Sequence, residues 1–275
     1  MIISIASGKG GTGKTTIATS LALSIGRNVQ FLDCDVEEPN ARIFLKPQIE
    51  KVEKVTVLVP EVDENKCDFC GKCSEVCEYN AIVVAKNKVL IFPELCHSCG
   101  GCVLFCPQKA IAEKEREIGK IEVGKAGDIG FISGILNVGE AMPVPMVSAV
   151  KRKINKEKSV IIDVSPGTSC PVVEAVKYSD YCILVTESTP FGLSDLKLAM
   201  GVLAKMKIPC GIVINKYDST YTKTEEFCKQ QDIPVLLKIP EDRKIAESYS
   251  KGEPLVKALP EYKNEFVKML ERIKK

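Results

Sequence analysis

"SGKGGTGKTT", residues 7–16, is the stretch that decides the fold of this chain. From Gly8 to Thr15 it matches the pattern G-x-x-x-x-G-K-[S/T], in which glycines let backbone N–H groups turn onto phosphate oxygens. A helix that begins at such a loop adds N–H donors and a favourable dipole. Lys14 reaches the outer phosphates, and the Thr15 hydroxyl ligates Mg²⁺. We therefore predict a nucleotide site with Mg²⁺ at Gly8, Lys9, Gly10, Gly11, Thr12, Gly13, Lys14, Thr15 and Thr16.

The residues around this loop predict a parallel α/β sheet. A short apolar run, residues 2–5, precedes the loop, and apolar residues at near-helical spacing follow it. Buried parallel strands read as continuous apolar runs. Such runs recur at 29–35, 159–167, 181–188, 209–216 and 234–240, and helical patterns lie at 172–176, 193–205 and 223–230. This alternation is typical of an α/β fold whose mostly parallel sheet is flanked by helices.

The bulk composition fits a globular protein of 275 residues, with 45% hydrophobic and 27% charged residues. The formal net charge of +2 predicts neither nucleic acid nor an anionic membrane as a partner. No apolar run reaches the roughly 18 residues of a transmembrane helix, and the start lacks a signal-peptide pattern. We therefore expect a cytoplasmic protein. The last segment carries a stripe that we expect to pack on the core, namely Phe266, Val267, Leu270 and Ile273.

Cysteine is over-represented, and eight of the thirteen cysteines fall between Cys67 and Cys106. In a cytosolic chain of this length, that density favours metal binding over disulfides. The segment "KCDFCGKCSEVCEYNAI" recurs 29 residues later as "LCHSCGGCVLFCPQKAI". Because neither half can bury a core alone, we predict that the two halves pack about a pseudo-two-fold axis.

Each half carries the run C-x₂-C-x₂-C-x₃-C, in which the fourth cysteine ligates the other cluster of a two-cluster ferredoxin. We predict two [4Fe–4S] clusters, the first held by Cys67, Cys70, Cys73 and Cys106, and the second by Cys96, Cys99, Cys102 and Cys77. The alternative is structural zinc, which takes four ligands and suits this rhythm less well. His97 is expected to be an exposed neighbour of the second site. The clusters would also supply folding free energy, since a segment of about fifty residues has little core.

A second lysine, Lys9 in "KGGTGKTT", resembles the deviant phosphate-binding loop of the MinD/ParA/nitrogenase iron protein class of P-loop ATPases. The resemblance implies that Lys9 crosses a dimer interface to the partner's nucleotide and neutralises charge on its phosphates. It also implies an ATP-dependent homodimer, or a heterodimer with a paralogue. ATP hydrolysis would then depend on Lys9, Lys14, Asp35 and Asp163.

Further segments resemble this family's switch regions. "LDCDVEEPN", residues 32–40, resembles switch I, with Asp35 orienting the attacking water and Asp33 ending the strand. "VIIDVSPG", residues 160–167, resembles the Walker B strand and switch II, with Asp163 holding a magnesium-bound water. Carboxylates at the carboxyl ends of adjacent parallel strands face the crevice where ligands bind. We expect both aspartates to lie beside the nucleotide.

The base pocket is also predicted by resemblance. Asn215 in "VINK" resembles the family's adenine-contacting asparagine, and "KIPEDRKIAES" resembles the loop that closes the base pocket through Pro240 and Asp242. Residues 215–218 also fit the guanine-reading pattern N-K-x-D. ATP is the expected nucleotide, and GTP is the alternative.

The family resemblance covers both α/β portions, so the cysteine segment is interpreted as an insertion. Residues 1–58 and 113–275 are predicted to form the ATPase domain, and residues 59–112 a small α+β domain resembling a ferredoxin. The charge-rich segment 113–120 is predicted to be an exit linker.

Three functions are open at this point. The first is a redox ATPase in which Mg-ATP gates electron delivery to a partner protein. The second is an assembly or carrier protein that passes on an iron–sulfur cluster, and the third is a spatial regulator with structural clusters. Cys170 lies where the nitrogenase iron protein has a ligand to its dimer-bridging cluster. Residues 133–143 lack the second cysteine of that site, so Cys170 is expected to be at most a transient ligand.

Overall fold

The computed structural model describes residues 1–274. The strands are β1 (Ile2–Ala6), β2 (Val29–Cys34), β3 (Gln48–Val62), β4 (Ile82–Ala85), β5 (Lys88–Ile91), β6 (Ile111–Ala126), β7 (Ile129–Leu136), β8 (Ser159–Val164), β9 (Tyr181–Glu187), β10 (Cys210–Tyr217) and β11 (Val235–Pro240). The helices are α1 (Lys14–Ile25), α2 (Ala41–Leu45), α3 (Lys72–Glu75), α4 (Gly101–Leu104), α5 (Val144–Lys151), α6 (Cys170–Val176), α7 (Pro190–Met206), α8 (Lys223–Gln230), α9 (Arg243–Ser250), α10 (Leu255–Ala258) and α11 (Glu261–Ile273). A 3-10 turn, η1, spans Pro93–Leu95.

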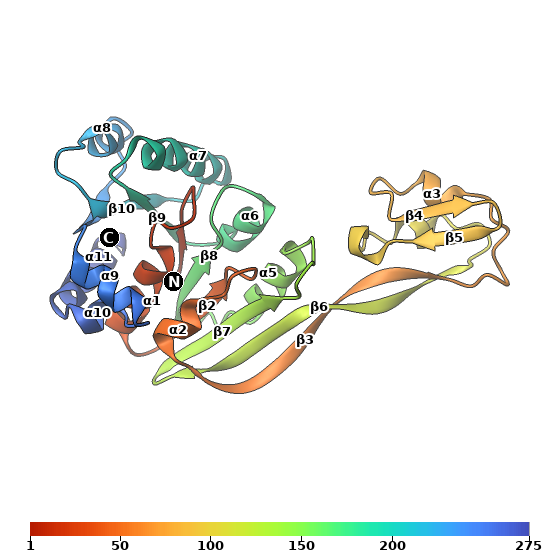
Figure 1. Ribbon diagram of the computed structural model, residues 1–275, viewed down its shortest axis with the longest axis horizontal. Helices are drawn as coiled ribbons and strands as arrows, with labels where there is room; N and C mark the ends of the chain where they lie inside the picture. The colour runs from red at the N-terminus through yellow and green to blue at the C-terminus, as the bar shows by residue number, and fades with distance from the viewer. Residues whose placement is uncertain (275) are drawn as a thin grey trace.

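A nine-stranded sheet organises the larger body, in the order β11-β10-β9-β1-β8-β2-β7-β6-β3. The strands from β11 to β7 are parallel to one another, whereas β6 is antiparallel to both of its neighbours, β7 and β3. Helices α1, α10 and α11 cover one face, and α5, α6 and α7 cover the other (Figure 1). The predicted α/β fold is confirmed, because its apolar runs are the buried central strands.

The stripe on α11 packs on the core as predicted, since Phe266 and Leu270 are buried against α1 and β11. Val267 is the exception, because it remains 37% exposed while Met269 takes its place inside. Among the described residues, 1–274, no helix combines the length and the apolar character that crossing a membrane requires.

Strands β3 and β6 form a long antiparallel ribbon that carries the cysteine segment away from the main sheet (Figure 1). The prediction of a linker at residues 113–120 is wrong, because this segment is the middle of β6. Strand β6 pairs with β7 only as far as Gly119, where a bulge also shifts its register with β3. Gly119 has φ +157°, and a Cβ there would lie 2.2 Å from the Ile135 carbonyl oxygen. Glycine therefore permits the close approach at which the ribbon leaves the sheet.

The small lobe at the end of the ribbon contains α3, β4, β5, η1 and α4 (Figure 1). Its backbone repeats with the sequence: the left-handed residues Phe69 and Asn80 have counterparts 29 positions later at Ser98 and Lys109. The pairing of Ile82 with Ile91 likewise matches that of Ile111 with Val62. One apolar cluster continues from the sheet into the lobe through Val57, Val59, Ala81 and Cys96. The ribbon thus joins the two parts by packed side chains as well as by hydrogen bonds.

Candidate functional site

The phosphate-binding loop lies at the carboxyl end of β1, in the middle of the sheet. Gly11 and Gly13 have φ values of +76° and +91°, which a residue with a side chain rarely adopts. A Cβ at Gly13 would also lie 2.4 Å from the side-chain nitrogen of Asn215. Gly13 precedes α1 and offers no side-chain cap, so the first N–H groups of the helix are free for an anionic ligand.

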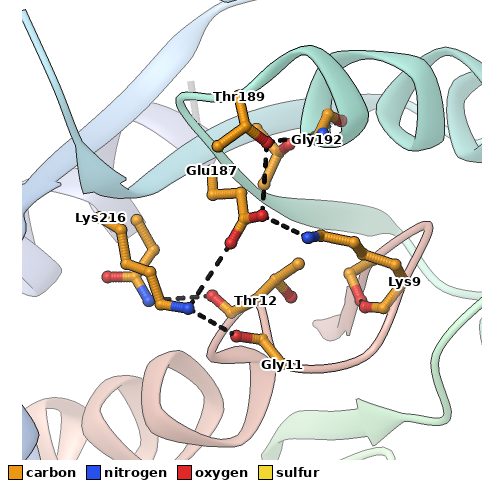
Figure 2. A network of polar contacts seen from close by, with 10 residues as sticks. Lys9, Gly11, Thr12, Glu187, Thr189, Gly192 and Lys216 are labelled. Carbon is orange, nitrogen blue, oxygen red and sulfur yellow. Dashed lines mark hydrogen bonds and ion pairs between the residues drawn. The ribbon is translucent and has the colours of Figure 1, made fainter.

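Two side chains of β10 donate hydrogen bonds to backbone carbonyls of this loop. The Asn215 Nδ2 donates to the Thr12 carbonyl at 2.9 Å. The Lys216 ammonium donates to the Gly11 carbonyl at 3.2 Å (Figure 2). Backbone carbonyls of the loop are thereby satisfied by the protein, which leaves the N–H groups for phosphate. The loop is held in shape by residues about 200 positions away in the sequence.

Lys9 forms an ion pair with Glu187, which ends β9. The same carboxylate lies 3.5 Å from the Lys216 ammonium and accepts a hydrogen bond from the Thr189 hydroxyl (Figure 2). Burial opposes ionisation of Glu187, but the charges of the two lysines outweigh it and lower the pKa of this carboxyl. Glu187 was not among the predicted site residues. Its position at the carboxyl end of an apolar strand was the available signal.

Three carboxylates gather on the other side of the loop. Asp33 and Asp163 are directly opposite each other in the pairing of β2 with β8, and both are fully buried. Asp33 accepts hydrogen bonds from the backbone N–H groups of Asp35 and Ala41, at 3.2 and 3.1 Å. It therefore fixes the loop that carries Asp35. Burial raises the pKa of Asp35, and the nearby Lys14 charge opposes that rise.

Asp163 differs from Asp33, because neither of its oxygens has a hydrogen-bond partner within residues 1–274. Burial raises the pKa of Asp163 to about 7, against the opposing effects of the Thr15 hydroxyl and the Lys14 charge. A buried carboxylate without a partner is costly unless a ligand satisfies it. Thr15 and Asp163 are hard oxygen ligands of the kind that Mg²⁺ prefers, so the residues present fit this ion.

Over residues 1–274, no group of three or more His, Cys, Asp or Glu side chains converges to hold a metal ion by itself. Mg²⁺ does not require such a cage, since it keeps several waters and takes one or two protein ligands plus substrate phosphates.

A pocket with about 890 Å³ of empty space opens beside the loop. Three of its lining residues are the ones predicted for the base, Asn215, Pro240 and Asp242. Asp242 also caps α9, because its carboxylate accepts from the Lys244 N–H at 2.7 Å. The predictions missed Ile245 and Tyr249, which line the same pocket from α9. Asp218 of the N-K-x-D pattern is exposed and accepts from the amide and hydroxyl of Thr220 instead.

The eight clustered cysteines line two cavities in the lobe, four in each. One, with about 330 Å³ of empty space, is lined by Cys67, Cys70, Cys73 and Cys106. The other, with about 420 Å³, is lined by Cys77, Cys96, Cys99 and Cys102. The structure therefore brings the cysteines together in the two sets that the spacing predicts. All eight are free thiols, and they surround a space rather than meet at a point. This arrangement suits a multi-iron cluster better than a single tetrahedral zinc.

Backbone N–H groups point at several of these sulfurs. The Ala81 N–H donates to Cys77 Sγ and the Ala110 N–H to Cys106 Sγ, both at 3.3 Å. Such bonds stabilise thiolates and tune cluster potentials. Burial raises the pKa of Cys73, and that of Cys102 to about 11, so metal-free protein keeps these thiols protonated. His97 is exposed and stacks on Tyr79 with ring centroids 3.5 Å apart. Cys170 is exposed at the start of α6.

Comparison with known proteins identifies the family. A family model described as the CobQ/CobB/MinD/ParA nucleotide binding domain matches residues 3–255, which is most of the chain. The chain belongs to this CobQ/CobB/MinD/ParA family. An uncharacterized protein of Methanocaldococcus jannaschii is 33% identical over 94% of this chain and 92% of its own length.

Two more distant family resemblances bear on fold and function. An iron-sulfur cluster carrier protein of Pyrococcus horikoshii is 25% identical over 99% of this chain and 87% of its own length. The septum site-determining protein MinD of the same organism, solved with Mg-ADP, superposes with a TM-score of 0.60 at 22% identity. That match covers 100% of this chain and 96% of the other, and it shows the fold.

Proposed function

We propose that this protein is an ATP-binding iron–sulfur protein in which Mg-ATP at residues 8–16 controls electron flow through two [4Fe–4S] clusters to a partner protein. The observation that carries the proposal is the sorting of eight cysteines into two cavities on a lobe that a two-stranded ribbon joins to a nucleotide-binding fold. In this proposal residues 59–112 form the inserted cluster-binding unit, and residues 1–58 with 113–275 form the ATPase.

On the nucleotide side, Lys14 and the N–H groups from Gly8 to Thr16 bind the phosphates, and Thr15 with Asp163 hold Mg²⁺. Asp35 orients the attacking water, since Asp33 fixes its backbone beside the loop. The base occupies the pocket between Asn215 and Tyr249. Adenine is favoured over guanine because Asp218, the residue that would read guanine, is held in its own turn by Thr220.

Lys9 has a second role in the proposal, at an ATP-dependent dimer interface. In the monomer its ammonium is paired with Glu187 of the same chain. It must leave this carboxylate to reach a nucleotide bound by a second copy. The dimer is thus coupled to the breaking of a contact that Figure 2 shows intact.

On the cluster side, each bound cluster supplies one-electron redox chemistry. The protein's contribution is to hold each cluster with four thiolates, to donate N–H groups to the sulfurs and to limit solvent access. Cys73 and Cys96 are only 8% and 9% exposed, so one ligand of each set lies inside the lobe. Buried ligation favours retention of the clusters and electron transfer.

The second candidate function is that of an iron–sulfur cluster carrier. It is favoured by the family member of that name that aligns with 99% of this chain. The two functions differ in what leaves the protein: an electron in one case, and a whole cluster with its iron in the other.

The test reduces anaerobically purified protein with dithionite, removes the excess, and mixes it with a viologen dye as one-electron acceptor. We expect Mg-ATP to change the rate of cluster reoxidation by about fivefold or more, in the range typical of coupled sites. The protein should retain its iron when it is separated from an added apo-ferredoxin. Lys14→Ala is the matched control, in which Mg-ATP should change nothing. Equal rates of cluster reoxidation with and without Mg-ATP, together with iron lost to the apo-ferredoxin, would refute the electron-transfer function. They would support the carrier function instead.

A further inference from the structure

A continuous route of hydrogen bonds runs from the Asp35 loop to the ribbon. The carbonyl of Val36, next to Asp35, accepts from the Leu136 N–H at 2.9 Å, where β7 ends. The following N–H, of Asn137, donates to the Ile118 carbonyl of β6, also at 2.9 Å. Movement of the Asp35 loop therefore acts on β6 where the ribbon leaves the sheet.

The route continues through a buried ion pair. Arg116, on the ribbon part of β6, makes two hydrogen bonds of 2.5 and 3.1 Å to the carboxylate of Glu140. The Glu140 side chain is only 3% exposed and that of Arg116 20%, so this pair is largely removed from water. Glu140 lies in the segment between β7 and α5, and its N–H donates to the Asn137 carbonyl. The segment that contacts the Asp35 loop thus also holds the guanidinium.

Strand pairing places Arg116 near the second cysteine cavity, because it pairs with Val57 of β3 and the next residue of β3, Leu58, lines that cavity. The hydrogen bonds to Glu140 raise the pKa of Arg116, so its guanidinium stays charged. In addition, Arg116 Nε is buried and has no hydrogen-bond acceptor within the described part of the chain. A buried N–H without an acceptor is unfavourable, so this group favours added negative charge beside it.

We propose that Arg116 is a positioning residue that links the nucleotide site to the second cluster: it stabilises the reduced cluster, and Glu140 transmits the state of the Asp35 loop to it. This inference rests on the proposed function. A cluster that takes up one electron becomes more negative by one charge, which a buried guanidinium favours. Glu140 partly cancels that charge. A nucleotide that shifts the segment carrying Glu140 changes how far Glu140 cancels the charge of Arg116. By linkage, reduction of the cluster must then change the affinity for the nucleotide by the same factor.

The test measures both cluster potentials by EPR-monitored redox titration, with and without a non-hydrolysable ATP analogue, in protein with full iron content. In the wild type, the analogue should shift the reduced-to-oxidised ratio of the second cluster about fivefold, or about 40 mV for one electron. Arg116→Gln should lower the potential of the second cluster and abolish the shift. Arg116→Lys keeps the charge but loses the paired geometry, so it should retain the potential and weaken the shift.

Glu140→Gln should raise the potential of the second cluster, because it leaves the guanidinium uncompensated, and it decides the question if Arg116→Gln does not fold. Glu117→Gln is the matched control: Glu117 is the next residue of β6, and its exposed side chain pairs with Lys54. It should leave both quantities unchanged. The inference would be overturned if Arg116→Gln and Glu140→Gln proteins bound iron and nucleotide but kept the wild-type potentials and the wild-type shift. The proposed function would survive that result. Wild-type protein without reducible clusters would instead refute the proposed function.

Discussion

The nucleotide loop and the cysteine lobe prepare their ligand sites in opposite ways. The loop is held by protein partners before any ligand binds, through Asn215, Lys216 and the Lys9–Glu187 pair. It also follows β1, an interior strand of a nine-stranded sheet. The lobe has a much smaller core of its own, consisting of Cys73, Ile82 and Ile111. Its two cavities are each lined by four cysteines.

The difference indicates what each ligand does for the protein. A nucleotide enters a preorganised site and changes individual contacts there, such as the ion pair of Lys9 with Glu187 and the missing partner of Asp163. The clusters complete the lobe, because a unit of this size rarely folds on its own core. Removing a ligand should therefore have a local effect at one site and a structural effect at the other.

The largest expected effect follows from removing iron from the lobe. Chelation, or the double variant Cys73→Ser and Cys102→Ser, should lower amide exchange protection in residues 63–110 by at least about a hundredfold. Helix α1 should keep its protection. Cys170→Ser is the control, because this exposed cysteine lies outside the lobe. Unchanged protection in iron-free protein would show that the lobe is as preorganised as the loop. The two sites would then not differ in the way described above.

Lys14→Ala should lower ATP turnover by at least about a hundredfold, in line with the loss of one strong charge-stabilising donor. Its iron content should stay at the wild-type level, since the lobe does not depend on the loop. Lys9→Ala should still bind ATP, but its ATP turnover or its ATP-dependent dimerisation should be impaired. Wild-type turnover in Lys9→Ala, measured by phosphate release, would contradict the dimer role of this lysine.

Asp163→Asn should stabilise the nucleotide-free protein at pH 8 by about 2–4 °C in Tm. The pKa of Asp163 is about 7 in the fold, against an ordinary value of 3.8. The folded state therefore holds this proton more tightly, and its stability falls as pH rises from about 4 to 7. The gain should shrink as pH falls below 7 and disappear only below about pH 4, where the carboxyl is protonated in the folded and the unfolded state.

Asp33→Asn is the matched control for that prediction: burial raises the pKa of Asp33 as well, but its two oxygens accept backbone N–H groups, and the NH2 group of an asparagine cannot accept one of them. Calorimetry should show no comparable gain for it. Equal stabilisation by both variants would mean that burial alone, and not the missing partner, governs Asp163.

The smallest effect concerns Glu187. Glu187→Gln should strengthen ATP-dependent dimerisation about two- to fivefold, because Lys9 no longer leaves a charged partner, and partly exposed ion pairs are worth little. Sedimentation with a non-hydrolysable analogue measures this. A weaker dimer would show instead that Glu187 orients Lys9 toward the second copy.

The sequence predicted those parts whose physical signal is local. Asp33 and Asp163 end continuous apolar runs, so their meeting at one sheet edge followed from the parallel sheet. The two sets of cysteines followed from the run C-x₂-C-x₂-C-x₃-C, which occurs twice and whose fourth cysteine belongs to the other set. The ribbon escaped prediction because its buried side chains, Val57 and Val59, come from β3, whereas residues 112–115 of β6 are exposed. "EKEREIGK" therefore carries charge where a sheet strand would carry apolar residues.

Other features escaped prediction because they depend on distant pairings. Glu187 meets Lys9 across 178 positions of sequence, and Arg116 meets Glu140 only after β6 and β7 have paired. Tyr249 enters the base pocket through the placement of α9, which no periodicity encodes. Such contacts are set by the fold as a whole.

The most direct test of the account is a metal and spin analysis of protein purified without oxygen. The account predicts about eight irons per chain and EPR signals from two reducible [4Fe–4S] clusters. Zinc in place of iron, with no EPR signal after reduction, would contradict it.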